Sequence, residues 1–143
     1  MFLNVWGVIW RNQKVVLANA ANVIAGGQPD PAAAAAARAA GMASRQNTIF
    51  SVTLIWFMTY TSHGPLIGND LSSSKVAIYW IITLIIIAVL ELNALGIMPW
   101  KREANKGLNV LYDGEATSPR NPIIAAFGLW IIFLILTEIF FRV

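Results

Sequence analysis

The sequence predicts an all-α integral membrane protein with three transmembrane helices and an N-terminal helix that is either amphipathic or spans half of the bilayer. Residues 76–95 and 123–141 form two apolar segments, each long enough to cross the hydrocarbon core as a helix, which takes about 20 residues. Only 12% of the residues are charged, whereas a soluble domain usually carries about 25%. A chain of 143 residues could not enclose this much apolar surface in water, so we expect it to be buried in a membrane.

The first expected span, residues 46–63, is shorter than the other two and richer in hydroxyl side chains. Such side chains are tolerated in lipid when they bond to their own helix or to a neighbouring one. We therefore expect this helix to pack mainly against protein. It should end before Pro65, because proline cannot extend a helix. The second and third spans are expected at 74–97 and 122–142, joined by a polar loop at 98–121.

The N-terminal segment, residues 1–24, has apolar side chains at helical spacing, but its most apolar part is too short to span a bilayer. It is either an amphipathic helix at the interface or the inner end of a spanning helix. Gly26 and Gly27 break this helix. A connecting segment, 25–45, then leads to the first span, and within it Asp30 is a good N-cap with Pro31 at the first helical position. The alanine-rich part of this segment is expected to be a short surface helix or a connector.

Positive charge indicates the orientation of the chain. Eight of the ten Lys and Arg residues fall in segments 11–46 and 98–121, against only Lys75 and Arg142 elsewhere. The positive-inside rule places both basic segments in the cytoplasm, and the C-terminus outside together with the loop between the first two spans, in the periplasm if the cell has two membranes. Aromatic and basic residues at the ends of the second span are expected to anchor it at the interfaces. These anchors are Trp80, Trp100, Lys101 and Arg102.

His63 is the only histidine and lies at the outer end of the first span. It could bind haem iron, or it could simply form hydrogen bonds at a helix end. Without cysteine, this chain cannot attach haem covalently, so the possible cofactor is non-covalent haem whose second ligand comes from elsewhere. We find no residue pattern typical of a metal site, and no interleaving of basic and exposed aromatic residues that would indicate nucleic-acid binding.

Two acidic residues lie within the expected spans. An ionisable group at Glu91 costs roughly 2.5–3.5 kcal/mol on insertion scales unless it is paired, neutralised or hydrated. Glu91 could serve a proton path, or it could accept an interhelical hydrogen bond from the first helix or another chain. Glu138 has the same two alternatives nearer the outer surface. Because their spans run in opposite directions, the two carboxylates are expected in opposite leaflets, where they could not form a catalytic pair.

Four sequence stretches resemble one bacterial family. They are MFLNVWGVIWRNQK, DPAAAAAARAAGMASRQNT, SHGP and LELNALG, and they extend from residue 1 to about residue 96. They resemble the C-terminal half of the membrane domain in the urate oxidase N-terminal domain family, the membrane-bound urate hydroxylases. His63 matches the family's histidine before a proline, and Arg45 and Asn47 match its Arg-x-Asn. The resemblance implies a location in a bacterial inner membrane, a half-spanning first helix and a setting near cytochromes, although no CxxCH motif is present.

The expected function is therefore that of a small integral membrane subunit of an electron-transfer assembly, structural or in contact with a cofactor, and not catalytic by itself. Its expected partners are the lipid bilayer and other membrane subunits, including cytochromes. One alternative is the C-terminal half of a split urate-hydroxylase-like oxidoreductase that binds haem. A second alternative is a membrane scaffold or transporter subunit without a redox role.

Overall fold

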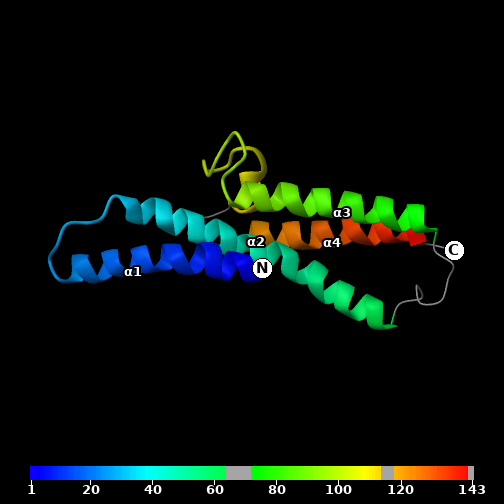
Figure 1. Ribbon diagram of the computed structural model, residues 1–143. Coiled ribbons are helices and arrows are strands. Elements are labelled where there is room, and N and C mark those ends of the chain that lie inside the picture. The colour runs from blue at the N-terminus through cyan, green and yellow to red at the C-terminus, as the bar shows by residue number, and fades with distance from the viewer. Residues whose placement is uncertain (64–71, 114–117, 142–143) are drawn as a thin grey trace.

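The computed structural model describes residues 1–63, 72–113 and 118–141, and within these the chain is helical and contains no β-strand. The prediction of an all-α fold is therefore confirmed. Figure 1 shows the arrangement of the elements along the chain. They are η1 (Asn4–Ile9), α1 (Trp10–Ile24), α2 (Ala32–His63), α3 (Ser73–Ala94), the short 3-10 helix η2 (Gly107–Leu111) and α4 (Arg120–Phe141).

Helices α3 and α4 lie side by side and antiparallel (Figure 1). Each has 22 residues and is long and apolar enough to cross a membrane, and only 22% of the most apolar part of each is buried inside the structure. They correspond to the second and third expected spans, 74–97 and 122–142. Helix α3 ends earlier than expected because Gly96, with a φ of 76°, terminates it in the left-handed region that favours glycine.

Helix α2 differs from the expectation, because no boundary separates the connector at 25–45 from the span at 46–63. It is one continuous helix of 32 residues. The predicted start is confirmed, since the Asp30 carboxylate accepts a hydrogen bond from the Ala32 amide at 2.8 Å. The alanine-rich part is not a surface helix, because Ala36, Ala40 and Ala43 are buried. Small side chains let neighbouring backbones approach closely, and this face of α2 packs against the rest of the fold.

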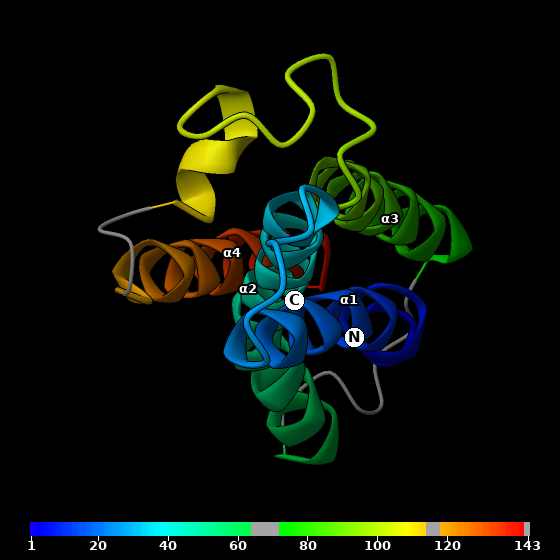
Figure 2. The same ribbon diagram turned by 90° about the vertical axis from the view of Figure 1, so that its left-hand side faces the viewer.

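Residues 2–24 form a helix that runs antiparallel to the first half of α2 (Figures 1 and 2). Its first turns are wider than an α-helix, as the Trp10 amide donates to the Val5 carbonyl five residues earlier. The hairpin of α1 and α2 projects beyond the ends of α3 and α4, and the N-terminus lies about halfway along the molecule (Figure 1).

The core lies where α2, α3, α4 and the segment around η2 meet. It is built around Met42, Ile49, Leu90, Tyr112 and Phe133. Beyond this core, the second half of α2 tilts away from α3 and α4 toward its C-terminal end (Figure 1). The fold is therefore tight at one end of the α3–α4 pair and open at the other.

Candidate functional site

Buried polar side chains gather at the tight end, where the N-terminal helix meets α2 and α3. Asn4 is only 2% exposed, and its Nδ2 donates to Asn47 Oδ1 and to Glu91 Oε2, both at 3.2 Å. A hydrogen bond to the first helix was one of the alternatives that the sequence left open for Glu91, and Asn4 provides it. Asn47 belongs to the same cluster.

Tyr112 continues this polar region from the loop side. Its ring is fully buried, and its hydroxyl lies against Gln46 Oε1 and 3.1 Å from the Leu90 carbonyl oxygen. Burial raises the pKa of Tyr112 to about 12, so its hydroxyl is neutral at physiological pH. Gln46 Nε2 is buried without a hydrogen-bond partner among the described residues. This arrangement ties the loop to α2 and α3 through one neutral hydroxyl.

Asp113 forms a charged clasp next to Tyr112. The whole residue is 5% exposed, and its carboxylate accepts hydrogen bonds from Arg38 Nη1 to Oδ1 and from Arg38 Nη2 to Oδ2, the latter at 2.9 Å. The Asn105 amide donates to Oδ2 at 2.7 Å, and Arg45 Nη1 lies 3.8 Å from Oδ1. Burial alone would raise the pKa of Asp113, but the hydrogen bonds and the two guanidinium groups lower it below its ordinary value. The acid is therefore ionised and held by two turns of α2.

The loop after α3 is organised by a second hydrogen-bonded group. Asn93 is fully buried, and its Nδ2 donates to Asn109 Oδ1 at 3.0 Å. Trp100 Nε1 donates to Asn93 Oδ1 at 2.6 Å, which gives this expected interface anchor an internal contact. Arg102 Nη2 bonds to the Leu95 carbonyl and so satisfies the end of α3. Lys101 is exposed in the same loop, and Trp80 is 53% exposed on α3.

The structure places Glu91 and Glu138 toward opposite ends of the α3–α4 pair. The hydroxyl of Tyr79, a residue near the start of α3, lies 3.4 Å from the hydroxyl of Thr137, which precedes Glu138 in the chain. Glu91 lies in the last turn of α3 instead. The two carboxylates do not meet, as we predicted from the opposite directions of the spans that carry them. His63 is the last residue of α2, and its side chain lies outside the described residues.

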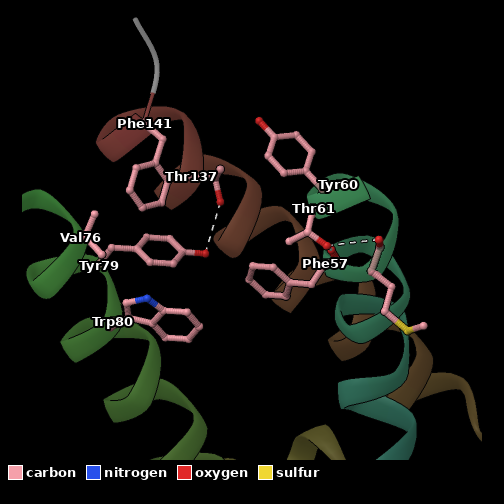
Figure 3. Close-up of a pocket in the computed structure, with 9 residues that line it drawn as sticks. Phe57, Tyr60, Thr61, Val76, Tyr79, Trp80, Thr137 and Phe141 are labelled. Atoms are coloured by element: carbon pink, nitrogen blue, oxygen red, sulfur yellow. Dashed lines mark hydrogen bonds between the residues drawn. The ribbon is translucent and has the colours of Figure 1, made fainter. Parts of the chain in front are cut away.

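Two hollows lie at the open end, between the second half of α2 and the α3–α4 pair. The larger, of about 480 Å³, is lined mainly by aromatic rings, among them Phe57, Tyr60, Tyr79, Trp80 and Phe141 (Figure 3). The Tyr79 and Thr137 hydroxyls meet at its wall. The smaller hollow, of about 230 Å³, lies on the other side of Phe57 and is lined by residues that include Met1, Phe50, Thr53 and Leu54.

Sequence reasoning missed the clasp at Asp113, which it treated only as part of a loop. A usable signal was present: Arg38 and Arg45 are seven residues apart, so on a helix they share a face and can approach one acid. In the parts of the chain that the structure describes, no group of three His, Cys, Asp or Glu side chains could hold a metal ion. The chemistry of the tight end is therefore that of a paired acid and neutral hydrogen-bonding groups.

Such an arrangement positions helices and offers no nucleophile with an adjacent base among the residues described above.

Comparison of the chain with protein-family models, with curated proteins and with solved structures found no match.

Proposed function

We propose that this chain is a small integral membrane subunit that assembles with other membrane proteins and is not catalytic by itself. The observation that carries the proposal is the exposure of large apolar side chains along α3 and α4, including Ile81, Leu84 and Ile124, which are 57%, 59% and 62% exposed. Contiguous exposed apolar surface of this kind marks contact with lipid or with another protein. Within a bilayer, α3, α4 and the second half of α2 are its three spans.

The ends of the helices support a definite orientation. The clasp at Asp113 and the exposed Lys101 lie at the tight end, which we assign to the cytoplasmic side. The N-terminal helix enters the inner leaflet from this side, with Trp6 and Trp10 at the interface, where Lys14 lies 5.9 Å from the centre of the Trp10 ring. The projecting hairpin is then cytoplasmic and the open end faces outward.

An electron-transfer setting is the finer part of the proposal. It rests on the resemblance of residues 1–96 to the membrane domain of urate hydroxylases, and on the match of His63 to the histidine of that family. Because His63 is the only histidine in the sequence, this chain cannot supply both axial ligands of a bis-histidine haem. A haem bound at His63 would therefore need its second ligand from a partner. The partner would then be a cytochrome or another redox subunit of the same membrane.

The membrane proposal is tested by extraction and by labelling. Because the chain has no cysteine, single cysteines can be introduced at Lys106 and at Lys75 without a background signal. We expect the protein to stay in the membrane at alkaline pH. A membrane-impermeant maleimide should label Lys75→Cys in intact spheroplasts and Lys106→Cys only after permeabilisation. Release by alkali would contradict membrane integration, and the reverse labelling pattern would contradict the orientation.

The redox setting is tested by a separate experiment. Native mass spectrometry after mild detergent extraction should recover the chain with redox subunits, and a reduced-minus-oxidised spectrum should show a haem band that His63→Ala removes. A band unchanged in His63→Ala would rule out this ligand. Recovery with a complementary helical half would instead favour a split urate-hydroxylase-like enzyme, and recovery without any chromophore would favour a scaffold.

A further inference from the structure

We propose that a hollow between α3 and α4, next to η2, binds one acyl chain of an anionic phospholipid from the cytoplasmic leaflet, with the lipid headgroup beside η2. The hollow has a volume of about 360 Å³ and shares no lining residue with the two hollows at the open end. This inference rests on the proposed membrane function and adds to it a binding site and a class of lipid.

The lining of this hollow is apolar and open toward one side. Each described residue that lines it is apolar. Its floor includes Ile49 and Leu129, which are 1% and 5% exposed, and its rim includes Ile85 and Ile132, which are 57% and 47% exposed. On helices that span a bilayer, an exposed apolar rim is in contact with the acyl chains of the surrounding lipid. The hollow is therefore accessible from the hydrocarbon core.

The short helix η2 closes the hollow at the tight end of the α3–α4 pair. It packs against both α3 and α4 (Figures 1 and 2), and its residues Leu108 and Leu111 belong to the lining. A transmembrane helix is about 10 Å wide and must cross a core of about 30 Å, so η2 would stand in its path. A single acyl chain is narrower and ends within one leaflet, so it can enter from the open side. The shape of the hollow therefore favours a lipid chain over a helix of a partner or of a second copy.

Basic residues are attached to both ends of η2. The Lys101 carbonyl oxygen accepts a hydrogen bond from Asn109 Nδ2 of η2 at 3.0 Å. Arg120 is the first residue of α4, and the next residue, Asn121, donates through Nδ2 to the Val110 carbonyl of η2 at 3.0 Å. Among the residues that the structure describes, neither Lys101 nor Arg120 belongs to an ion pair. Both cations are therefore available to a charged group beside η2.

The acids in the same loop do not cancel this charge. Glu103 forms an ion pair with Lys106, and Asp113 forms one with Arg38. Lys101 and Arg120 thus leave the described surroundings of η2 with an excess of positive charge. Basic sites at the cytoplasmic ends of transmembrane helices bind anionic lipid headgroups. The charge therefore selects an anionic lipid, and the hollow next to it receives one acyl chain.

Gly128 offers a way to fill the hollow without disturbing its walls. It is part of the lining, and nothing lies within 4 Å of a Cβ atom built at this position. Gly128→Phe should occupy the space of the acyl chain, whereas Gly128→Ala should leave most of it open. Ile131→Phe is the control for added bulk, because Ile131 is 47% exposed on the same helix but does not line the hollow.

The test is native mass spectrometry of the full chain released from nanodiscs that contain equal amounts of phosphatidylglycerol and phosphatidylethanolamine. We expect the wild type to retain one phosphatidylglycerol, with a preference of about tenfold over phosphatidylethanolamine. Gly128→Ala and Ile131→Phe should retain this lipid, and Gly128→Phe should reduce its retention about tenfold or more. The double variant Lys101→Gln, Arg120→Gln should still retain a lipid, but without the preference for phosphatidylglycerol.

A second measurement uses only the wild type, so it does not depend on the folding of any variant. A phosphatidylglycerol that carries a diazirine in the middle of one acyl chain is photoactivated in the same nanodiscs. It should label Val89 and Ile132, which line the hollow, about tenfold more than Ile124 and Ile131, which are exposed elsewhere on α4.

The inference is overturned if the wild type retains no lipid or retains the two lipids equally. It is also overturned if Gly128→Phe retains as much phosphatidylglycerol as Gly128→Ala, or if the photolabel is spread evenly over the four positions. Retention at alkaline pH is measured separately in native membranes. If the protein is retained there but the lipid results fail, only the lipid site is refuted, whereas release by alkali refutes the membrane function itself.

Discussion

Arg38 and Asp113 are 75 residues apart in the chain and form a two-point ion pair between α2 and the segment that follows η2. The Asp113 side chain is 7% exposed and that of Arg38 is 27% exposed, so the pair lies at the edge of the interior. Parallel hydrogen bonds between a guanidinium group and a carboxylate fix direction as well as distance. The pair therefore determines where the loop docks on α2.

Replacing this acid should destabilise the fold. Asp113→Asn removes the charge that Arg38 and Arg45 share and weakens the contact to the Asn105 amide. We expect a loss of about 1–3 kcal/mol in the free energy of unfolding, measured by circular dichroism in detergent. Glu103→Gln is the control, because its pair with Lys106 is exposed and should contribute under about 0.5 kcal/mol. An equal loss of unfolding free energy in the two variants would show that the clasp at Asp113 stabilises the fold no more than an exposed ion pair does.

The same carboxyl group should make stability depend on acid pH. Its folded-state pKa is lowered, so its contribution is fully present above the unfolded-state pKa of about 3.9 and is lost as the pH falls through the folded-state pKa. The difference in melting temperature between the wild type and Asp113→Asn should stay constant from pH 7 to about pH 5 and then shrink below about pH 4. A difference that is independent of pH down to about pH 2 would contradict this assignment.

Tyr112 should produce the opposite dependence at alkaline pH. Its pKa is raised from 10.0 to about 12 by burial, so its stabilising contribution is present below pH 10.0 and is lost as the pH rises toward 12. Tyr112→Phe should cost about 1–3 kcal/mol near neutral pH, because the contacts to Gln46 and the Leu90 carbonyl are lost. The difference in the free energy of unfolding between Tyr112→Phe and the wild type should narrow as the pH rises from 10.0 toward about 12. The ultraviolet absorbance of tyrosinate, followed in both proteins, checks which residue titrates.

Local sequence signals predicted the elements that depend on local chemistry. Asp30 before Pro31 marked the start of α2, and its side chain caps that helix. The two apolar segments became α3 and α4. No helix boundary lies at residue 45, where the connector was expected to meet the span, because the change from alanine-rich to apolar sequence alters what surrounds the helix without breaking its backbone hydrogen bonds. Environment and secondary structure change at different places along α2.

The site depended on contacts that no local pattern contains. Asn4 meets Glu91 across 87 residues, and Tyr112 meets Gln46 across 66. Glu91 was singled out because a carboxylate is costly in an apolar segment, but the asparagine that pairs with it carried no such cost signal. Acids in apolar surroundings can be recognised from sequence, whereas their neutral partners are defined by how the helices pack.

Gly107 should be intolerant of a side chain. Its φ is 51°, and a Cβ atom there would lie 2.4 Å from Cδ2 of the Trp100 ring. Gly107→Ala should therefore displace Trp100 from Asn93 and cost at least about 1 kcal/mol. Gly41→Ala is the matched control, because Gly41 lies within α2 with open space around it, and this change should stabilise by about 0.5–1 kcal/mol. The fluorescence of a variant that retains only Trp100 would report the displacement, and similar stability of both variants would contradict it.

Two substitutions of Glu91 distinguish a structural role of its carboxyl group from a role in proton transfer. In Glu91→Gln the amide oxygen can still accept a hydrogen bond from Asn4 Nδ2, so we expect less than about 0.5 kcal/mol of destabilisation. Glu91→Leu leaves Asn4 with only the bond to Asn47 and should cost about 1–3 kcal/mol. If Glu91 only positions the N-terminal helix, the Gln variant should also retain full activity of the assembly. Normal stability and assembly of Glu91→Gln with lost activity would instead mean that the carboxyl group carries a proton, since the two side chains share a shape and differ in the ability to titrate.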